Sequence, residues 1–187
     1  MLTDAHLLTR LQAGDEASFE ALFLRHYDRV YGVLFRLFGN RADAEDVAQQ
    51  VFLKLYHAPH RIRLRGNEVN LAGWLYRVAV NSGYNTLRSQ KRRRNWYLKL
   101  AHRRPPEPLH PDPADALADR EEQARVRAVL ATMKPRDAKL LLLRHSGLSY
   151  KELAAALNLA PGSIGSLLTR AERAFAHKYR LAFSEKE

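Results

Sequence analysis

The sequence predicts an all-α protein made of two small helical domains joined by a proline-rich linker. Apolar residues recur at spacings of three and four along most of the 187 residues, which is the period of helices with one buried face. Five of the eight prolines fall within residues 105–118, where they disfavour both helix and central strand. A chain of this length suits one domain or two small ones. We therefore expect domains at residues 1–104 and 119–187, with the linker at 105–118.

Four helices are expected in the first domain, at residues 2–13, 16–38, 41–57 and 70–104. Gly14-Asp15 and Gly39-Asn40 separate the first three, because glycine suits the turn that ends a helix and Asp or Asn caps the next one. Residues 58–68 contain a proline, a glycine and three alternate arginines, and we expect a loop there.

The third expected helix has a surface that helix stability does not explain. Its inward stripe consists of Ala44, Val47, Ala48, Val51, Phe52 and Leu55. Acidic residues in the first turn, Asp43, Glu45 and Asp46, are accounted for by the helix dipole. The helix dipole does not account for Gln49, Gln50 and the exposed Leu53. A surface that binds a partner would explain them.

The net charge of +11 is concentrated in one part of the chain. Residues 61–104 carry twelve Lys or Arg against one Glu, together with Trp74, Tyr76, Tyr84, Trp96 and Tyr97. Such a tract on a helix favours polyanions, and aromatic side chains can stack on bases. A solvated basic face without function is the alternative. Leu71, Leu75, Val78, Ala79 and Trp74 are expected to face the core.

The second domain is expected to contain a helix-turn-helix. Its predicted helices span residues 121–133, 136–145, 150–158 and 161 to about 183. Ser149 and Glu152 have the spacing of a capping box, and Pro161 suits a first helical turn. The inward positions are Leu153, Ala154, Leu157, Ile164, Leu168, Ala171 and Phe175. The last helix can then present its polar side chains to a DNA major groove. A plain helical hairpin is the alternative.

Composition excludes several other classes of protein. The absence of cysteine removes disulfides, thiolate catalysis and cysteine-ligated zinc. No apolar run is long enough for a membrane span, and the first residues do not resemble a secretion signal, so we expect a cytoplasmic protein without membrane insertion. The eight histidines show no metal-ligand spacing. We expect no catalytic residue, no metal and no cofactor.

Three stretches in order resemble the extracytoplasmic-function group of bacterial RNA polymerase sigma factors. They are AEDVAQQVFLKLY (44–56), WLYRVAVNSGYNTLRSQKRR (74–93) and LSYKELAAALNLAPGSIGSLLTRAERAF (148–175). The resemblance covers nearly the whole chain. It implies a bundle like sigma region 2, followed by a helix-turn-helix like sigma region 4.

The resemblance also implies partners and site residues. The first stretch would bind the β′ clamp coiled coil of core polymerase through Asp46, Gln49, Gln50 and Leu53, and the β flap of the polymerase is a further expected partner. Melted minus-10 DNA would be contacted by Arg61, Arg63, Arg77, Asn81, Tyr84, Asn85, Arg88, Lys91 and Arg92. The loop at 59–68 would hold a flipped base. Double-stranded minus-35 DNA would be contacted by Ser149, Tyr150, Pro161, Gly162, Ser163, Ser166, Leu167, Arg170 and Arg173. An anti-sigma factor is a further partner of many such proteins.

Two departures from the family pattern stand out. Asn85 replaces a usual acidic residue. In the last helix, Gly165 and Leu167 replace two usual cations, which predicts a weaker or unusual minus-35 interaction. Leu167 would instead be able to meet a thymine methyl group.

Two other functions are compatible with DNA binding. A dimeric regulator acting without polymerase would leave the Gln-rich surface and the basic helix without a purpose. A DNA-cleaving or recombining enzyme would need a cluster of metal ligands or a nucleophile, which the spacing of the His and acidic residues does not supply. The sequence favours a dissociable promoter-specificity subunit of polymerase over both.

Overall fold

The computed structural model describes residues 2–62, 69–100 and 117–183, and all of its regular elements in these ranges are helical. The first half contains α1 (Asp4–Gln12), α2 (Glu16–Phe38), α3 (Arg41–His57), the short 3₁₀ helix η1 (Pro59–Arg61) and α4 (Leu71–Leu100). The second half contains α5 (Leu117–Thr132), α6 (Pro135–His145), α7 (Tyr150–Leu157), the 3₁₀ helix η2 (Pro161–Ser163) and α8 (Ile164–Phe183). The predicted all-α fold is confirmed.

The expected breaks between the first helices are confirmed by their caps. Asp15 accepts a hydrogen bond from the Ala17 N–H at the start of α2, and Asn40 accepts one from the Asp43 N–H at the start of α3. Gly39 ends α2 with a φ of 73°, a left-handed conformation that glycine adopts without strain. The first helix is shorter than predicted, because Thr3 is its N-cap and accepts from the His6 N–H.

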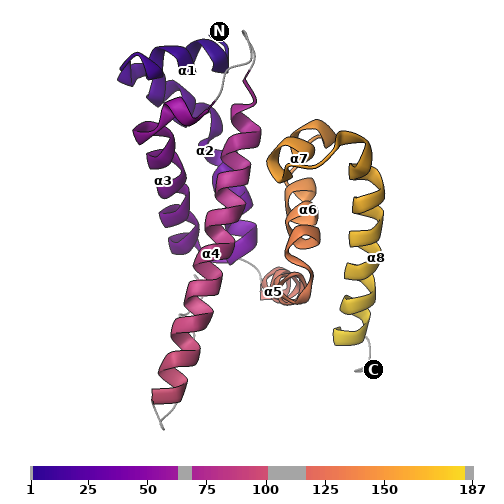
Figure 1. Ribbon diagram of the computed structural model, residues 1–187. Coiled ribbons are helices and arrows are strands. Elements are labelled where there is room, and N and C mark those ends of the chain that lie inside the picture. Colours follow the sequence, from indigo (N-terminus) through magenta and orange to yellow (C-terminus); the bar gives the residue numbers. More distant parts are fainter. Residues whose placement is uncertain (1, 63–68, 101–116, 184–187) are drawn as a thin grey trace.

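The core of the first half lies between α2, α3 and α4. All six positions of the predicted α3 stripe are buried, as are Leu71, Leu75 and Ala79 on α4. Val78 and Trp74 are only half-buried, whereas Tyr76 and Val80 are buried although they were not expected to be. The buried face of α4 is thus rotated relative to the prediction. The second half explains this, because α7 packs against α4 from the side opposite α3 (Figure 1).

The helices of the second half differ from the prediction mainly at their ends. α5 begins at Leu117, within the last two positions of the expected linker; residues 105–116 of that linker lie outside the described residues. The capping box is present, since Ser149 Oγ accepts from the Glu152 N–H while a Glu152 oxygen accepts from the Ser149 N–H. Asn158 is the left-handed C-cap of α7 rather than its last residue, and Pro161 opens a 3₁₀ turn that leads into α8. Leu157 and Phe175 are half-buried instead of buried.

The two halves pack against each other. α7 lies along the first part of α4, and α5 and α6 contact α2 (Figure 1). The Arg127 side chain of α5 lies over Gly39, so closely that a Cβ atom at Gly39 would overlap its guanidinium. The division into domains at residues 104 and 119 stays a prediction.

Candidate DNA-binding and partner-binding surfaces

One face of α4 combines cations, amides and an aromatic ring. Arg77, Asn81, Asn85 and Arg88 are exposed on it, and Tyr84 is half-buried between them. These positions recur at spacings of three and four and therefore share one side of the helix. α4 contains seven Lys or Arg and no acidic residue. The face is thus uniformly positive, as a surface for a phosphate backbone would be.

Lys139 of α6 covers part of this face. Its Nζ donates a hydrogen bond of 2.6 Å to Asn81 Oδ1 and lies 5.4 Å from the centroid of the Tyr84 ring. Burial, and then repulsion by Arg88, lower the pKa of Lys139. Burial raises the pKa of Tyr84 to about 12. Two of the predicted minus-10 contacts, Asn81 and Tyr84, are therefore engaged by the other half of the chain.

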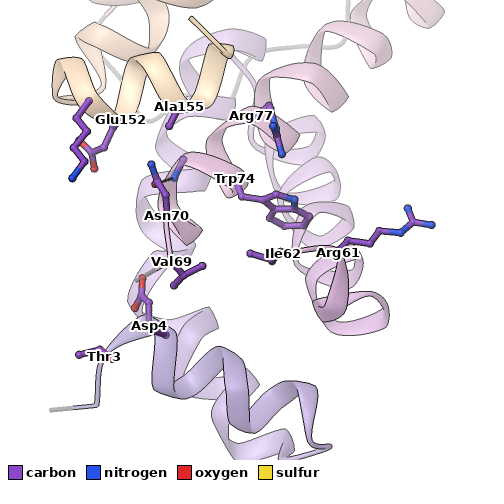
Figure 2. Close-up of a pocket in the computed structure, with 13 residues that line it drawn as sticks. Thr3, Asp4, Arg61, Ile62, Val69, Asn70, Trp74, Arg77, Glu152 and Ala155 are labelled. Carbon is purple, nitrogen blue, oxygen red and sulfur yellow. Dashed lines mark hydrogen bonds between the residues drawn. The ribbon is translucent and has the colours of Figure 1, made fainter. Parts of the chain in front are cut away.

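A hollow of about 910 Å³ lies beside the start of α4. Figure 2 shows the Trp74 ring between Arg77 and Ile62, with Thr3 and Asp4 on one side and Glu152 and Ala155 of α7 on the other. Arg61 also lines it, whereas the predicted contact Arg63 and the rest of the loop at 63–68 lie outside the described residues. An aromatic wall with two arginines suits a nucleotide base and its phosphate.

The predicted partner surface of α3 is exposed as one patch. Asp46, Gln49, Gln50 and Leu53 all face solvent, and the side chain of Leu53 is 51% exposed. The opposite stripe of α3 is fully packed, so these residues are not needed for the core. Next to them, Lys54 donates to Ser82 Oγ of α4 at 2.9 Å, which ties this helix to the basic one.

An aromatic ladder on α2 was missed in the sequence. Phe19, Phe23, Tyr27, Tyr31 and Phe35 recur every four residues, and each ring contacts the next at 4.8 to 6.2 Å between centroids. All five are half-buried, and Phe19 also contacts Tyr56 of α3. Leu24 beside the ladder is 70% exposed. The four-residue repeat of aromatic residues was the signal in the sequence that could have revealed this ladder. The ladder extends the apolar surface next to the α3 patch.

The predicted minus-35 surface lies at the start of α7 and on η2 and α8. Ser149, Tyr150, Pro161, Gly162, Ser166, Arg170 and Arg173 are exposed, and Ser163 is half-buried. Three hydroxyls and one guanidinium on α8 and η2 bond to backbone oxygens of their own segment, among them Ser166 Oγ to the Ser163 oxygen at 3.0 Å. The three hydroxyls would have to exchange partners to donate to a base, whereas Arg170 uses only its Nε and can reach DNA with its terminal N–H groups.

Leu167 does not belong to this surface. Its side chain is 6% exposed and packs in the core with Ile164 and Leu168. The expectation that it meets a thymine methyl group is wrong, because position 167 falls on the buried stripe of α8. The residue that replaces a family cation here thus serves packing instead.

Other kinds of site find no support in the described parts of the chain. Residues 2–62, 69–100 and 117–183 hold no group of three or more His, Asp or Glu placed to bind a metal ion. Within the same ranges, no helix is long and apolar enough to cross a membrane.

Comparison with known proteins identifies the two halves. Residues 22–93 match the family model for sigma-70 region 2, and residues 123–175 match that for sigma-70 region 4. The chain is 32% identical over 201 residues to the ECF RNA polymerase sigma-E factor of Haemophilus influenzae, with 95% of each chain covered. The chain belongs to the extracytoplasmic-function sigma factors of bacterial RNA polymerase. Proteins of this family direct polymerase to promoters and start transcription there.

Two further comparisons show how far the similarity to known sigma factors extends. The ECF sigma factor SigE of Mycolicibacterium smegmatis is 32% identical over 161 residues, which cover 84% of this chain but 61% of the relative. The sigma factor RpoE of Bartonella quintana, solved in complex with the anti-sigma factor NepR, shares the fold with a TM-score of 0.58 and 20% identity over 87% of this chain and 96% of that one. On the structure, region 2 spans most of α2, all of α3 and α4 up to Arg93, and region 4 runs from α5 to Phe175.

Proposed function

We propose that this sigma factor binds core polymerase through the exposed patch of α3, contacts melted minus-10 DNA with the basic face of α4, and contacts minus-35 duplex with η2 and α8. The observation that supports the assignment most is the acid-free face of α4 beside the Trp74 hollow. A separated strand offers its phosphates to cations and its pairing edges to amides and rings. The proposed β flap contact falls to the second half.

The minus-10 role divides among three kinds of side chain. Arg77, Arg88, Lys91 and Arg92 would hold phosphates, because a cation needs no base identity. Asn81 and Asn85 would read base edges, since an amide offers both a donor and an acceptor. Trp74 and Arg61 would enclose a base turned into the hollow, and Tyr84 would stack on a base further along α4.

The chemistry of RNA synthesis would remain with the polymerase. In this proposal the sigma factor contributes only binding energy, which offsets the cost of opening the duplex, so it has no catalytic residue and needs no cofactor. Working on the chromosome places it in the cytoplasm. A regulator that acts without polymerase is not favoured, because the relatives are polymerase sigma factors.

An anti-sigma factor is the expected regulator. The fold is shared with a sigma factor that was solved with such a partner. Leu53 of the proposed polymerase surface is an exposed apolar side chain, as is Leu24 of α2. A partner that covers them would compete with polymerase.

Two measurements test this function. Run-off transcription with core polymerase on a randomised promoter library should yield one enriched pair of promoter elements. Co-sedimentation with core polymerase should show a one-to-one complex that Gln49→Ala with Gln50→Ala weakens about tenfold. The matched control is His57→Ala, which is exposed on the same helix outside the patch. Absence of a complex with the unaltered chain would refute the proposal.

A further inference from the structure

The end of α4 extends beyond the helical bundle. Gln90 Nε2 donates to Asp43 Oδ1 of α3 at 3.0 Å, and after this contact all side chains from residue 91 to residue 97 are exposed. Figure 1 shows this part of α4 projecting past α2 and α3. It carries two adjacent large aromatics, Trp96 and Tyr97, which are 58% and 57% exposed. Water-exposed aromatic pairs of this size indicate a binding surface.

The projecting end continues the proposed DNA face of α4. At 100° per residue, Asn81, Arg88, Arg92 and Trp96 fall within about 80° of one another around the helix axis. Tyr97 falls instead on the side of the buried residues Leu75 and Ala79. Its ring meets that of Trp96 edge-on, with centroids 5.4 Å apart and planes at 71°. Tyr97 thus lies away from the DNA face, although its ring still contacts that of Trp96.

The positive charge around Trp96 indicates which kind of partner this surface binds. Residues 91–94 are four consecutive cations, and no carboxylate occurs anywhere in α4. This positive charge attracts a polyanion, while an indole stacks on any base. Membrane binding fits less well, because cations surround the aromatic pair on both sides of the helix and leave no continuous apolar face. The region 2 match ends at residue 93, so the family model covers neither Asn95 nor Trp96.

We propose that Trp96 is a stacking platform for a nucleotide at a second DNA contact, separate from the one at Asn81. The proposal rests on the proposed minus-10 role of α4. Fifteen residues separate Trp96 from Asn81, or about 22 Å along the helix axis. At roughly 3.4 Å per nucleotide, the rise of a helically stacked strand, the second contact lies about six nucleotides from the base at Asn81, and fewer nucleotides away on an extended strand.

Fluorescence anisotropy with a labelled oligo(dT) of twelve nucleotides tests this on the full chain. Trp96→Ala should weaken binding about tenfold, because one lost base stack has an effect of this order. Trp96→Phe should keep most of the affinity. The slope of affinity against salt should not change in either variant, since no cation is removed. Tyr97→Ala removes an equally exposed ring from the other side of the helix and should weaken binding less than threefold.

The possible results separate this proposal from the proposed function. Unchanged binding by Trp96→Ala, or equal losses for Trp96→Ala and Tyr97→Ala, overturns the stacking platform. Binding of core polymerase is measured independently by co-sedimentation. If the chain forms the polymerase complex but Trp96→Ala has no effect, only the platform fails; if no complex forms, the proposed function fails whatever the oligonucleotide result.

A second, independent observation concerns the free protein. Lys139 Nζ donates a hydrogen bond to Asn81 Oδ1 and lies over the Tyr84 ring. These are the groups proposed to receive a base. α7 flanks the Trp74 hollow at the same time. We infer that this packing is a closed state, in which the second half of the chain blocks the minus-10 face until polymerase separates the two halves.

The sign of one mutational effect tests the closed state. Lys139→Ala removes a cation, so electrostatics alone would weaken binding of the same oligo(dT). A closed state predicts the opposite, a gain of about threefold or more, because a charged hydrogen bond that favours closure is lost. Lys134→Ala removes an exposed cation just before α6 and should weaken binding slightly or leave it unchanged. Equal or weaker binding by Lys139→Ala overturns the inference.

Discussion

The two helices proposed to meet promoter DNA are built differently. α4 carries seven cations without an acid, passes close to α2 and projects beyond the bundle. α8 carries four Lys or Arg and one Glu, and the polar groups at its start are bonded to its own backbone. A cation-rich helix suits a separated strand whose phosphates lie close by. In the proposed function α8 would depend on its shape and a few arginines, so its contribution to affinity should be smaller than that of α4.

The largest expected effect comes from the close crossing of α4 and α2. A Cβ atom at Gly83 would lie 2.5 Å from Leu37 Cδ2 and 3.3 Å from Leu34 Cδ2, both in the core. Gly83→Leu should therefore lower the free energy of unfolding by about 3 kcal/mol, measured by urea denaturation. Asn85→Leu adds the same side chain on the exposed face and should change it by less than about 0.5 kcal/mol. Similar values for both variants would show that the crossing is not tight.

Replacing two arginines of α4 tests whether the charge on its proposed DNA face binds DNA. Arg88→Ala with Arg92→Ala should make the slope of log affinity against log salt less steep by about 1.4, because each contact with a single-strand phosphate contributes about 0.7. At 0.1 M salt this loss corresponds to about 25-fold weaker binding. Arg93→Ala with Arg94→Ala removes the same charge from other sides of the helix and should cost clearly less. Equal losses would mean that α4 attracts DNA without a preferred face. The corresponding pair on α8, Arg170 and Arg173, should affect minus-35 duplex and not the single strand.

The support of α4 depends on α1 and α2, which are joined by a partly buried ion pair. Asp4 accepts from Arg25 at 2.6 Å and from His26 Nε2 at 2.8 Å. Burial alone raises the pKa of Asp4, but these hydrogen bonds and the positive charge of Arg25 and His26 outweigh it and hold the pKa below the ordinary value of an aspartate. A carboxylate with a depressed pKa stabilises the fold above its unfolded pKa and loses this effect as the pH falls through the folded value.

Asp4→Asn should therefore cost about 1 kcal/mol of unfolding free energy at pH 7. The difference from the unaltered chain should shrink as the pH falls through the depressed pKa of Asp4, because Asp4 itself becomes protonated there. Urea denaturation at pH 7 and pH 3 measures both values. A difference that stays constant over this range would assign the effect to packing rather than to charge.

Local patterns in the sequence predicted most of the fold. The caps at Asp15, Asn40 and Ser149 were recognisable because each satisfies backbone groups within three residues. The burial of Tyr76 was not, since it depends on α7 packing against α4. That of Leu167 was recognisable, because it lies three residues after Ile164 on the same helical stripe. The contact between Lys139 and Asn81 joins residues 58 positions apart, and no local rule could predict it. Exposed site residues such as Gln49 were found because they remained unexplained by helix stability.

The smallest effect is expected at Gly165 of α8, and it completes the comparison with Gly83. The nearest atom to a Cβ at Gly165 is Tyr150 Cε2 at 3.8 Å, an ordinary contact, so an alanine fits without strain. Gly165→Ala should raise the free energy of unfolding by up to about 1 kcal/mol through helix propensity, measured by urea denaturation. Gly165→Lys should give a smaller gain in stability and also steepen the salt dependence of binding to minus-35 duplex by about 0.9. If lysine leaves the salt dependence unchanged while alanine stabilises the helix, then α8 does not approach the phosphates at this position. A weak minus-35 contact of α8 would then result from the geometry of the helix rather than from the missing cation.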